Sequence, residues 1–411
     1  MTYETLDDVP APGSMLVRLD LNSPVDGEEI RDNKRFERHG KTVRRMLDAG
    51  HRVVLMAHQG RPNRDDYIPL EPHAELLSEY VGTDIEYVDD TYGEPAIRAI
   101  RDVEPGEALL IENVRFVQDE LAEKTPAEHA DTPFVRSLSG EFDYYVNDAY
   151  SVSHRTHTSL VGFPQVLDAY AGPVLDEEYR YNTSVRERDF EGNVTMVLGG
   201  TKAADVIPVM EAVVDRVDDF LLGGVVGELC LRAAGHDVGY DLEGMDLFDE
   251  QWETYGPTLE ALIEEHAEKF HLPIDVAYED ENGERAETAV EGLSKDRAYL
   301  DIGSETLASY RPIIRDSEAV FVKGAVGVFE DERFGVGTAG ILETVADADC
   351  FSVVGGGDTA RALDLYELDE GNFAHVSVAG GAYIRALTGE SLPGVEALLK
   401  GDSKPEPADI V

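Results

Sequence analysis

Short apolar runs recur along the chain, and most of them stop at glycines or polar residues. Buried strands of parallel sheets have this pattern, because helices cover both faces of the sheet. In the first half the runs occupy residues 15–21, where apolar and polar positions alternate, 53–57, 108–111 and 144–146. In the second half they occupy residues 194–198, 220–222, 319–322, 351–354 and 376–379. Stretches such as 33–49, which Gly50 ends, separate the runs and predict helices.

The alternation of strands and helices predicts an α/β fold. The chain has 411 residues, which is too long for one ordinary core and suits two domains. Gly172-Pro173 interrupts the pattern and precedes a predicted helix that extends to about Arg188. We therefore predict two Rossmann-like domains, residues 1–171 and 172–394, each with a parallel β-sheet flanked by helices, joined by a hinge helix.

The run at 351–354 is followed by three glycines, a carboxylate and a hydroxyl, at residues 355–359. Glycines let backbone N–H groups approach an anion, and we expect a helix to start near Ala360. Asp358 would then lie where a Mg²⁺ ion that bridges two phosphates needs an oxygen ligand, with the Thr359 hydroxyl beside it. Glycine-rich turns also occur for purely steric reasons, so this stretch alone leaves that alternative open.

Other strands of the second half also end in glycine turns, at residues 199–202 and 223–224. Repeated turns of this kind suit a nucleotide. The chain contains neither a Gly-x-x-x-x-Gly-Lys-Ser/Thr motif nor a Gly-x-Gly-x-x-Gly fingerprint opening a first βαβ unit, so a P-loop NTPase and a dehydrogenase are not indicated. Lys202 follows the first turn and suits a transferring phosphoryl group, although a loop lysine at the surface is the alternative.

In the first half, basic and polar side chains follow the strand ends instead of glycines. Ligands of open α/β sheets bind beyond the carboxyl ends of the strands, and guanidinium groups bind phosphate and carboxylate bidentately. These side chains could therefore converge on a small phosphorylated acid. They are Asp20, Asn22, Arg35, His58, Arg61, Arg115 and Arg155. The alternatives are an exposed polar face on the first strand and arginines that only balance surface acids.

The acidic surplus is large. The chain has 84 acidic and 35 basic residues, a formal net charge of −49, yet 42% of its residues are hydrophobic, which suits a normal core. Such a charge repels itself in dilute buffer, whereas at about 1 M salt the Debye length is only about 3 Å. The composition is typical of a halophilic protein. It argues against nucleic acid as a partner.

The expected location is the cytoplasm. Cys230 and Cys350 match no metal-ligand spacing and are interpreted as reduced core residues. The N-terminus lacks the basic and apolar pattern of a signal peptide, and no apolar run approaches the roughly 20 residues that cross a bilayer. We expect a soluble protein with no membrane partner.

Taken together, the motifs resemble those of the phosphoglycerate kinase family, in the family's order and along essentially the whole chain, in a halophilic, archaeal type. The matching stretches are 17–24 (VRLDLNSP), 58–62 (HQGRP), 112–116 (ENVRF), 147–150 (NDAY), 154–157 (HRTH), 198–202 (LGGTK), 327–330 (GVFE), 355–359 (GGGDT) and 375–377 (HVS). The resemblance implies reversible phosphoryl transfer between 1,3-bisphosphoglycerate and ADP, giving 3-phosphoglycerate and MgATP in glycolysis or gluconeogenesis. It also implies a monomer, and a C-terminal segment, 395–411, that returns to the first domain.

The resemblance assigns roles by position. The glycerate phosphate and carboxyl would contact Asp20, Asn22, Arg35, His58, Arg61, Arg115 and Arg155. The nucleotide would contact Lys202, Glu330 (at the ribose), Gly355, Gly356, Gly357, Asp358 (at Mg²⁺) and Thr359. The base would be lined by Gly199, Gly200, Gly223, Gly224 and Gly303. Because the acceptor carboxylate is already ionised at pH 7, catalysis needs only positioning and charge neutralisation, by Arg35, Lys202 and N–H groups near Gly380 and Gly381.

Three departures from the family pattern lie near the nucleotide phosphates. Val206 stands where the family has a second lysine, and the turns at residues 322–325 and 378–381 differ in sequence. Lys323 could supply the charge that is missing at Val206. Two rival hypotheses remain, a kinase for another phosphorylated carboxylic acid and a non-catalytic nucleotide-binding protein on the same fold.

Overall fold

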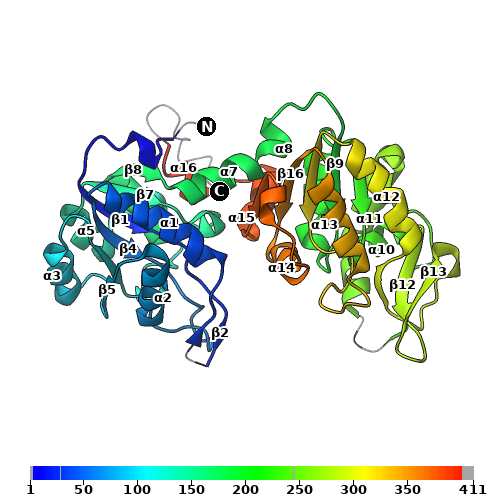
Figure 1. Cartoon of the computed structure of the whole chain (residues 1–411), viewed down its shortest axis with the longest axis horizontal. Helices are drawn as coiled ribbons and strands as arrows, with labels where there is room; N and C mark the ends of the chain where they lie inside the picture. Colours follow the sequence, from blue (N-terminus) through cyan, green and yellow to red (C-terminus); the bar gives the residue numbers. More distant parts are fainter. Residues whose placement is uncertain (1–2, 28, 243, 245, 400–411) are drawn as a thin grey trace. The chain divides into compact units, whose positions relative to one another are not determined.

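The computed structural model describes residues 3–27, 29–242, 244 and 246–399, which form two compact units. The first unit comprises the described residues up to Arg180 together with 391–399, and the second comprises those from Tyr181 to Glu390 (Figure 1). The division lies inside helix α7 (Pro173–Asn182), later than the expected boundary at 171/172. Of the expected returning segment 395–411, residues 400–411 lie outside the described residues.

The first unit is built on a six-stranded sheet in which every neighbouring pair is parallel. Its order is β5 (Ile85–Val88), β6 (Ala108–Ile111), β4 (Arg52–Met56), β1 (Ser14–Arg18), β7 (Tyr144–Asn147) and β8 (Asp168–Ala171). The four strands expected in this half are β1, β4, β6 and β7, and they are adjacent. Their carboxyl ends therefore lie along one edge of the sheet.

Helices flank this sheet, as Figure 1 shows. They are α1 (Lys34–Asp48), α2 (Glu71–Val81), α3 (Glu94–Asp102), α4 (Pro126–Ala130), α5 (Pro133–Leu138), α6 (Thr158–Val161) and α16 (Pro393–Glu396). A hairpin joins β2 (Val25–Asp26) to β3 (Glu29–Ile30). Short 3-10 helices lie at Leu6–Asp8, Val114–Phe116, Ser139–Glu141, Tyr150–Val152 and Phe163–Gln165.

The helix that carries Arg35 has a clear start and a clear packing face. The Asn33 side chain caps α1 by accepting from the Arg35 N–H at 3.0 Å, and Gly50 beyond its end has a φ of 81°. Phe36 and Val43 are fully buried in the core of the first unit. Burial of this face fixes α1 on the sheet, and its first turn therefore holds Arg35 beside the end of β1.

The end of the described chain packs on the first unit. Asn147 Nδ2 donates to the Gly394 carbonyl at 3.0 Å, and Leu399 forms an antiparallel bridge with Tyr3. Asn147 is the last residue of β7. This late segment of the chain therefore contacts the sheet that carries the first unit's candidate site.

The second unit repeats the parallel arrangement. Its six-stranded sheet has the order β11 (Phe270–His271), β10 (Asp219–Leu222), β9 (Val194–Leu198), β15 (Ala319–Lys323), β16 (Phe351–Gly355) and β17 (His375–Ser377). A separate antiparallel sheet, which the sequence did not predict, has the order β13 (Arg285–Ala289), β12 (Asp275–Glu279) and β14 (Tyr299–Ile302). The predicted class, two parallel sheets flanked by helices, is confirmed.

The helices of the second unit are α8 (Ser184–Glu187), α9 (Ile207–Val213), α10 (Gly224–Ala233), α11 (Asp246–Glu265), α12 (Ser304–Asp316), α13 (Val336–Asp347), α14 (Gly357–Leu365) and α15 (Gly381–Thr388). Short 3-10 helices lie at Ala203–Asp205, Ala267–Lys269, Val290–Gly292 and Glu370–Asn372. The expected helix start near Ala360 is wrong, because α14 begins at Gly357. The glycine-rich turn therefore contributes its last glycine to the helix.

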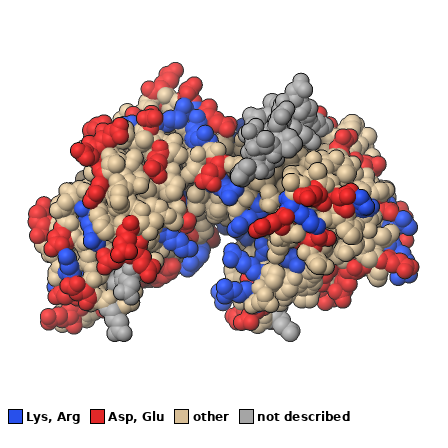
Figure 2. All heavy atoms as spheres, turned by 180° about the vertical axis from the view of Figure 1, so that it is seen from behind, with Lys and Arg blue, Asp and Glu red and all other residues tan. Residues whose placement is uncertain are grey.

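Acidic side chains are spread over both units, and Lys and Arg side chains gather on part of the first unit (Figure 2). Cys230 is buried, Cys350 is half-buried, and both are free thiols. Among the described helices, none is long and apolar enough to cross a membrane.

Candidate functional site

The candidate site of the first unit begins with Arg18 at the end of β1. Its side chain is fully buried, and Nε donates to Ser159 Oγ at 2.9 Å while Nη2 donates to His58 Nδ1 at 3.2 Å. Burial lowers the pKa of His58 well below its usual value, and the Arg18 charge lowers it further. His58 is therefore a neutral imidazole at pH 7, held by a guanidinium group.

Asp20 lies two residues beyond β1 and is 3% exposed. Its carboxylate is 3.4 Å from Arg35 Nη1 and accepts from Ser151 Oγ. Burial by itself raises the pKa of Asp20, but the Arg35 charge, the neighbouring His58 and the hydrogen bond from Ser151 together outweigh it, and the net pKa lies well below the usual range. Asp20 is therefore an ionised group that holds Arg35 in place.

A buried acid, Glu120, completes the support of this region. Its two oxygens accept from the Ser159 N–H at 2.8 Å and the Ser159 hydroxyl at 2.7 Å. Burial raises the pKa of Glu120 to about 7, although the nearby Arg18 charge opposes the rise. Ser159 therefore links an acid and a guanidinium group that water cannot reach.

Two of the four predicted arginines, Arg115 and Arg155, lie in one electrostatic region with Arg18. Burial lowers the pKa of His157 to about 3, and the charges of Arg18, Arg115 and Arg155 lower it further. Arg115 has its own pKa lowered to about 10 by burial and by Arg18. The grouping of Arg115 and Arg155 with Arg18, in a chain with excess acid, favours a shared role over the alternative that these arginines only balance surface acids.

Backbone contacts position the remaining groups around Gly60. Asn22 Oδ1 accepts from the Gly60 N–H at 2.9 Å, Arg115 Nη1 donates to the Gly60 carbonyl, and Arg35 Nη1 donates to the Asn22 carbonyl. Gly60 has a φ of 65°, and an added Cβ would overlap Asp66, so glycine is needed at this turn. Arg61 and Arg155 are exposed.

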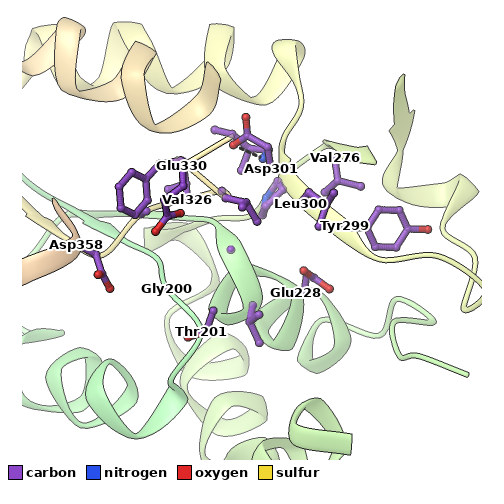
Figure 3. Close-up of a pocket in the computed structure, with 18 residues that line it drawn as sticks. Gly200, Thr201, Glu228, Val276, Tyr299, Leu300, Asp301, Val326, Glu330 and Asp358 are labelled. Atoms are coloured by element: carbon purple, nitrogen blue, oxygen red, sulfur yellow. Dashed lines mark hydrogen bonds between the residues drawn. The ribbon is translucent and has the colours of Figure 1, made fainter. Parts of the chain in front are cut away.

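The second unit contains a cavity of about 370 Å³ beyond the ends of β9, β10 and β15 (Figure 3). Four predicted nucleotide residues line it, namely Gly200, Gly224, Glu330 and Asp358. Apolar side chains form much of the rest of the wall. Glu330 and Asp358 lie toward one end in Figure 3, whereas Glu228 and Tyr299 lie toward the other. The cavity therefore has an acidic rim at one end and a mostly apolar interior.

Three glycines that were expected to line the base are not among the cavity-lining residues, and each is packed behind the wall. An added Cβ at Gly199 would overlap Ala325, one at Gly223 would overlap Val326, and one at Gly303 would overlap Asp275. The Gly199 N–H donates to the Lys323 carbonyl at 3.0 Å. These glycines allow close packing of the chain that supports Gly200 and Gly224.

The glycine-rich turn after β16 leads directly into α14. Gly356 caps the helix with a φ of 101°, and Gly357 and Asp358 are exposed at its first turn. Gly355 is buried under Tyr383, where an added Cβ would overlap the ring. The Thr359 hydroxyl is fully buried, donates to the Gly355 carbonyl at 3.1 Å and accepts from the Gly324 N–H at 3.2 Å. Thr359 thus ties two glycine turns together.

Two lysines lie near this end of the cavity. Lys202 is exposed after β9, and Lys323 is the last residue of β15. Burial lowers the pKa of Lys323, the Lys202 charge lowers it further, and Asp205 and Asp358 oppose the change. Val206 is 1% exposed, so its side chain belongs to the core. Gly380 and Gly381 lie at the N-terminus of α15, where backbone N–H groups have no helical partner.

Sequence reasoning missed several residues of the two sites. Arg18 was assigned to a polar face that is usually exposed, and only the central position of β1 shows that the face is buried. Arg361 Nη2 lies 3.4 Å from Glu330, and Nη1 lies 3.7 Å from Asp358. Glu228 also lines the cavity. Arg361 follows Asp358 by three residues on α14, but the predicted helix start near Ala360 left Asp358 outside the helix, so this signal was missed.

Comparison with known proteins identifies the relatives of this chain. A family model described as phosphoglycerate kinase matches residues 7–390. A phosphoglycerate kinase of Halorubrum lacusprofundi is 60% identical over 96% of this chain and 98% of its own length. One of Haloarcula marismortui is 56% identical over 97% of this chain and 100% of its own length. The crystal structure of phosphoglycerate kinase from Pyrococcus horikoshii is 31% identical, with a TM-score of 0.87 over 96% of this chain and 98% of that one.

Proposed function

The chain belongs to the phosphoglycerate kinase family, and we propose that the two sites described above carry out the family's reaction. That reaction is phosphoryl transfer between 1,3-bisphosphoglycerate and ADP, which gives 3-phosphoglycerate and ATP. The enzyme is a phosphotransferase with a carboxyl group as acceptor. The observation that carries the assignment of sites is the shared positive field of Arg18, Arg115 and Arg155 in a chain of net charge −49.

We assign 3-phosphoglycerate to the first unit. Its phosphate and carboxylate groups need several cations, and guanidinium forks pair with both groups bidentately. Arg61 and Arg155 are exposed and can reach a ligand from solvent, whereas Arg35 is half-buried and held by Asp20. His58, neutral at pH 7, offers a hydrogen bond rather than a charge. The groups proposed to contact the glycerate are Asp20, Asn22, Arg35, His58, Arg61, Arg115 and Arg155.

We assign the nucleotide to the cavity of the second unit. Its apolar interior suits a base, and the acidic rim with the glycine turns suits the ribose and phosphates. The proposed contacts are Gly200, Lys202, Gly224, Glu330, Gly355, Gly356, Gly357 and Asp358. Gly199, Gly223 and Gly303 support this wall from behind, and Thr359 acts by holding the turn.

A Mg²⁺ ion bound with the nucleotide fits this donor set. The described residues contain no group of three His, Cys, Asp or Glu side chains that could hold a metal by themselves. Magnesium in phosphoryl-transfer sites takes one or two carboxylates together with phosphate oxygens and water, and the exposed Asp358 offers one carboxylate. The ion would neutralise phosphate charge there.

The proposed mechanism relies on charge and position. The acceptor carboxylate of 3-phosphoglycerate is ionised at pH 7, so no general base is required. Arg35 and Lys202 stabilise the oxygens of the transferring phosphoryl group, and N–H groups at Gly380 and Gly381 add neutral donors. A basic site in one unit and a glycine-rich site in the other also predict a closure about the hinge helix that excludes water and aligns the transfer.

The test is an assay of ATP-dependent phosphorylation of 3-phosphoglycerate, run at KCl concentrations from about 0.1 to 3 M with circular dichroism in parallel. Activity that rises with salt together with the folded signal is expected. A chain that is folded at high salt and inactive with this substrate contradicts the assignment. Activity with another phosphorylated acid would then support the rival kinase, and binding of ATP without any turnover would support the non-catalytic protein.

We also propose that the enzyme works as a monomer in the cytoplasm. The free thiols Cys230 and Cys350 suit a reducing compartment, and the glycolytic substrates are found there. Sedimentation at high salt should give the mass of one chain, 45.1 kDa. A sedimentation mass of twice that value would contradict the monomer.

A further inference from the structure

One acidic side chain in the cavity of the second unit has no role in the mechanism above. Glu228 lies on α10, one turn after Gly224, and lines the end of the cavity away from Asp358 (Figure 3). The residue is 5% exposed, and its neighbours in the wall include the apolar side chains of Val276 and Leu300. A carboxyl group in such a place needs an explanation, because burying it costs free energy unless it is paired or neutral.

The other buried acid of the cavity serves the protein itself. Asp301 accepts from Arg285 Nη1 at 2.9 Å, from the Ile302 N–H at 2.9 Å and from the Gly337 N–H at 2.8 Å. Its oxygens therefore hold the wall together. Three of the roughly four acceptor positions of this carboxylate are therefore occupied by the protein.

Glu228 has fewer protein partners than Asp301 and keeps one carboxyl oxygen without a protein donor among the described residues. Its one hydrogen bond within the described structure comes from the Tyr240 hydroxyl, which donates to Oε2, and no cation faces it there. Arg232, one turn further along α10, pairs instead with Asp249 of α11 at 2.9 Å. The second carboxyl oxygen, Oε1, is thus available to an occupant of the cavity.

The protonation state follows from this environment. Burial raises the pKa of Glu228 to about 8, and the hydrogen bond from Tyr240 opposes the rise. The titratable groups that face it are the phenols of Tyr240 and, from β14, Tyr299, both with pKa values raised by burial. At pH 7 the group is a neutral acid. With Tyr240 donating to Oε2, the proton lies on Oε1.

We propose that Glu228 selects the base of the nucleotide, donating from Oε1 to a ring nitrogen of adenine and accepting at Oε2 from the adjacent amino group. Adenine offers an acceptor nitrogen beside an exocyclic donor, whereas guanine offers a ring N–H beside an exocyclic acceptor. Because Tyr240 donates to Oε2, the donor of Glu228 is Oε1 and its acceptor is Oε2. This arrangement matches the acceptor and donor of adenine and does not match the donor and acceptor of guanine. This inference rests on the assignment of the cavity to the nucleotide.

The test measures nucleotide binding directly, by calorimetric titration of the full chain with MgADP and MgGDP in about 2 M KCl. Glu228→Gln keeps a donor and an acceptor and should retain the preference for adenine. Glu228→Leu removes both and should reduce the ratio of the two affinities about tenfold. Glu330→Gln, at the other end of the cavity, should weaken both nucleotides by the same factor and leave the ratio unchanged.

A pH series distinguishes base recognition by Glu228 from a structural role. In the wild type, the ratio of the affinities for MgADP and MgGDP should fall as pH rises from about 6.5 to 9.5, because the ionised carboxylate can only accept hydrogen bonds. The Glu228→Gln ratio should stay constant over the same range. An unchanged ratio in Glu228→Leu, in protein that is folded by circular dichroism, overturns the inference. If the wild-type protein shows no turnover with 3-phosphoglycerate, the proposed function is overturned instead. The ratio of the two affinities is measured by binding and does not depend on turnover.

Discussion

The candidate sites of the two units are built by different physical means. In the first unit the site consists of charged side chains, and other charged side chains fix them, as Asp20 fixes Arg35. In the second unit the site consists mainly of glycine turns around a cavity, with few cations. The excess Asp and Glu side chains of this chain can form ion pairs with a guanidinium group, whereas a backbone N–H carries no net charge that they could cancel. The first site should therefore respond most to changes of charge, whereas the second should respond to changes of backbone shape as well as to the loss of its few lysines.

The largest expected effect is the loss of Arg35. Arg35→Ala should lower kcat/KM about 10²–10³-fold, because a preorganised donor to the transferring group is removed. Arg44→Ala is the matched control, since Arg44 lies on the same helix, is half exposed, pairs with Asp48 across one turn at 2.9 Å and otherwise donates to the Val81 carbonyl at 3.5 Å, away from the site. It should leave kinetics unchanged. Equal kinetics for the two variants would remove Arg35 from the mechanism.

The lysines test whether the second unit depends on charge at all. Lys202→Ala should lower kcat about 10²-fold. Lys323→Ala should raise the KM for ATP about tenfold with a smaller change in kcat, because Lys323 lies by Asp358 and Lys202 but is partly buried. Steady-state kinetics with both substrates separate the two outcomes. If neither variant changes the kinetics with ATP, the second site works through backbone groups alone.

Backbone shape is tested at Gly200, which has a φ of 98° and lines the cavity. Gly200→Ala forces an L-residue into this conformation at a cost of about 1–2 kcal/mol, and the affinity for ATP should fall up to tenfold. The KM for 3-phosphoglycerate should not change. Gly140→Ala is the control, because nothing lies within 4 Å of an added Cβ there and its φ is not positive. An ATP affinity equal to that of the wild type would show that the turn tolerates a side chain.

Much of this organisation could be predicted from the sequence, because both sites follow strand ends. The parallel strands gave continuous apolar runs, and the edge where β1, β4, β6 and β7 end carries the predicted basic residues. The small antiparallel sheet could not be predicted, since strands such as 285–289 are polar and half exposed. Arg18 and Glu120 were missed for a related reason. Their partners are distant in sequence, and a charged residue is normally taken as exposed.

Within the second unit, side-chain and backbone roles could not be separated from the sequence. The sequence does not distinguish the neighbouring glycines Gly199 and Gly200, yet Gly199 is packed against Ala325 and Gly200 lines the cavity. The role of Glu228 depends on Tyr240, which lies in a segment that has no motif. Sequence patterns thus pointed to the turns, and the packing decides which residue of each turn lines the cavity.

The smallest expected effect concerns acid stability. The pKa of Asp20 is held low because the Arg35 charge and the other groups around the carboxylate together outweigh burial. Asp20 therefore stabilises the fold above its ordinary pKa of about 3.9 and loses this contribution as pH falls toward the folded pKa. Asp20→Asn should lower the free energy of unfolding by about 1 kcal/mol at pH 7, and the gap to the wild type should narrow at about pH 3.5. Thermal unfolding at high KCl measures the difference in stability at both pH values.

The control is Asp358→Asn, at an exposed carboxylate 3.7 Å from Arg361, which should differ in stability from the wild type at neither pH. A gap for Asp20→Asn that stays constant with pH would mean that its carboxylate acts through shape rather than charge, which would contradict the contrast between the two units.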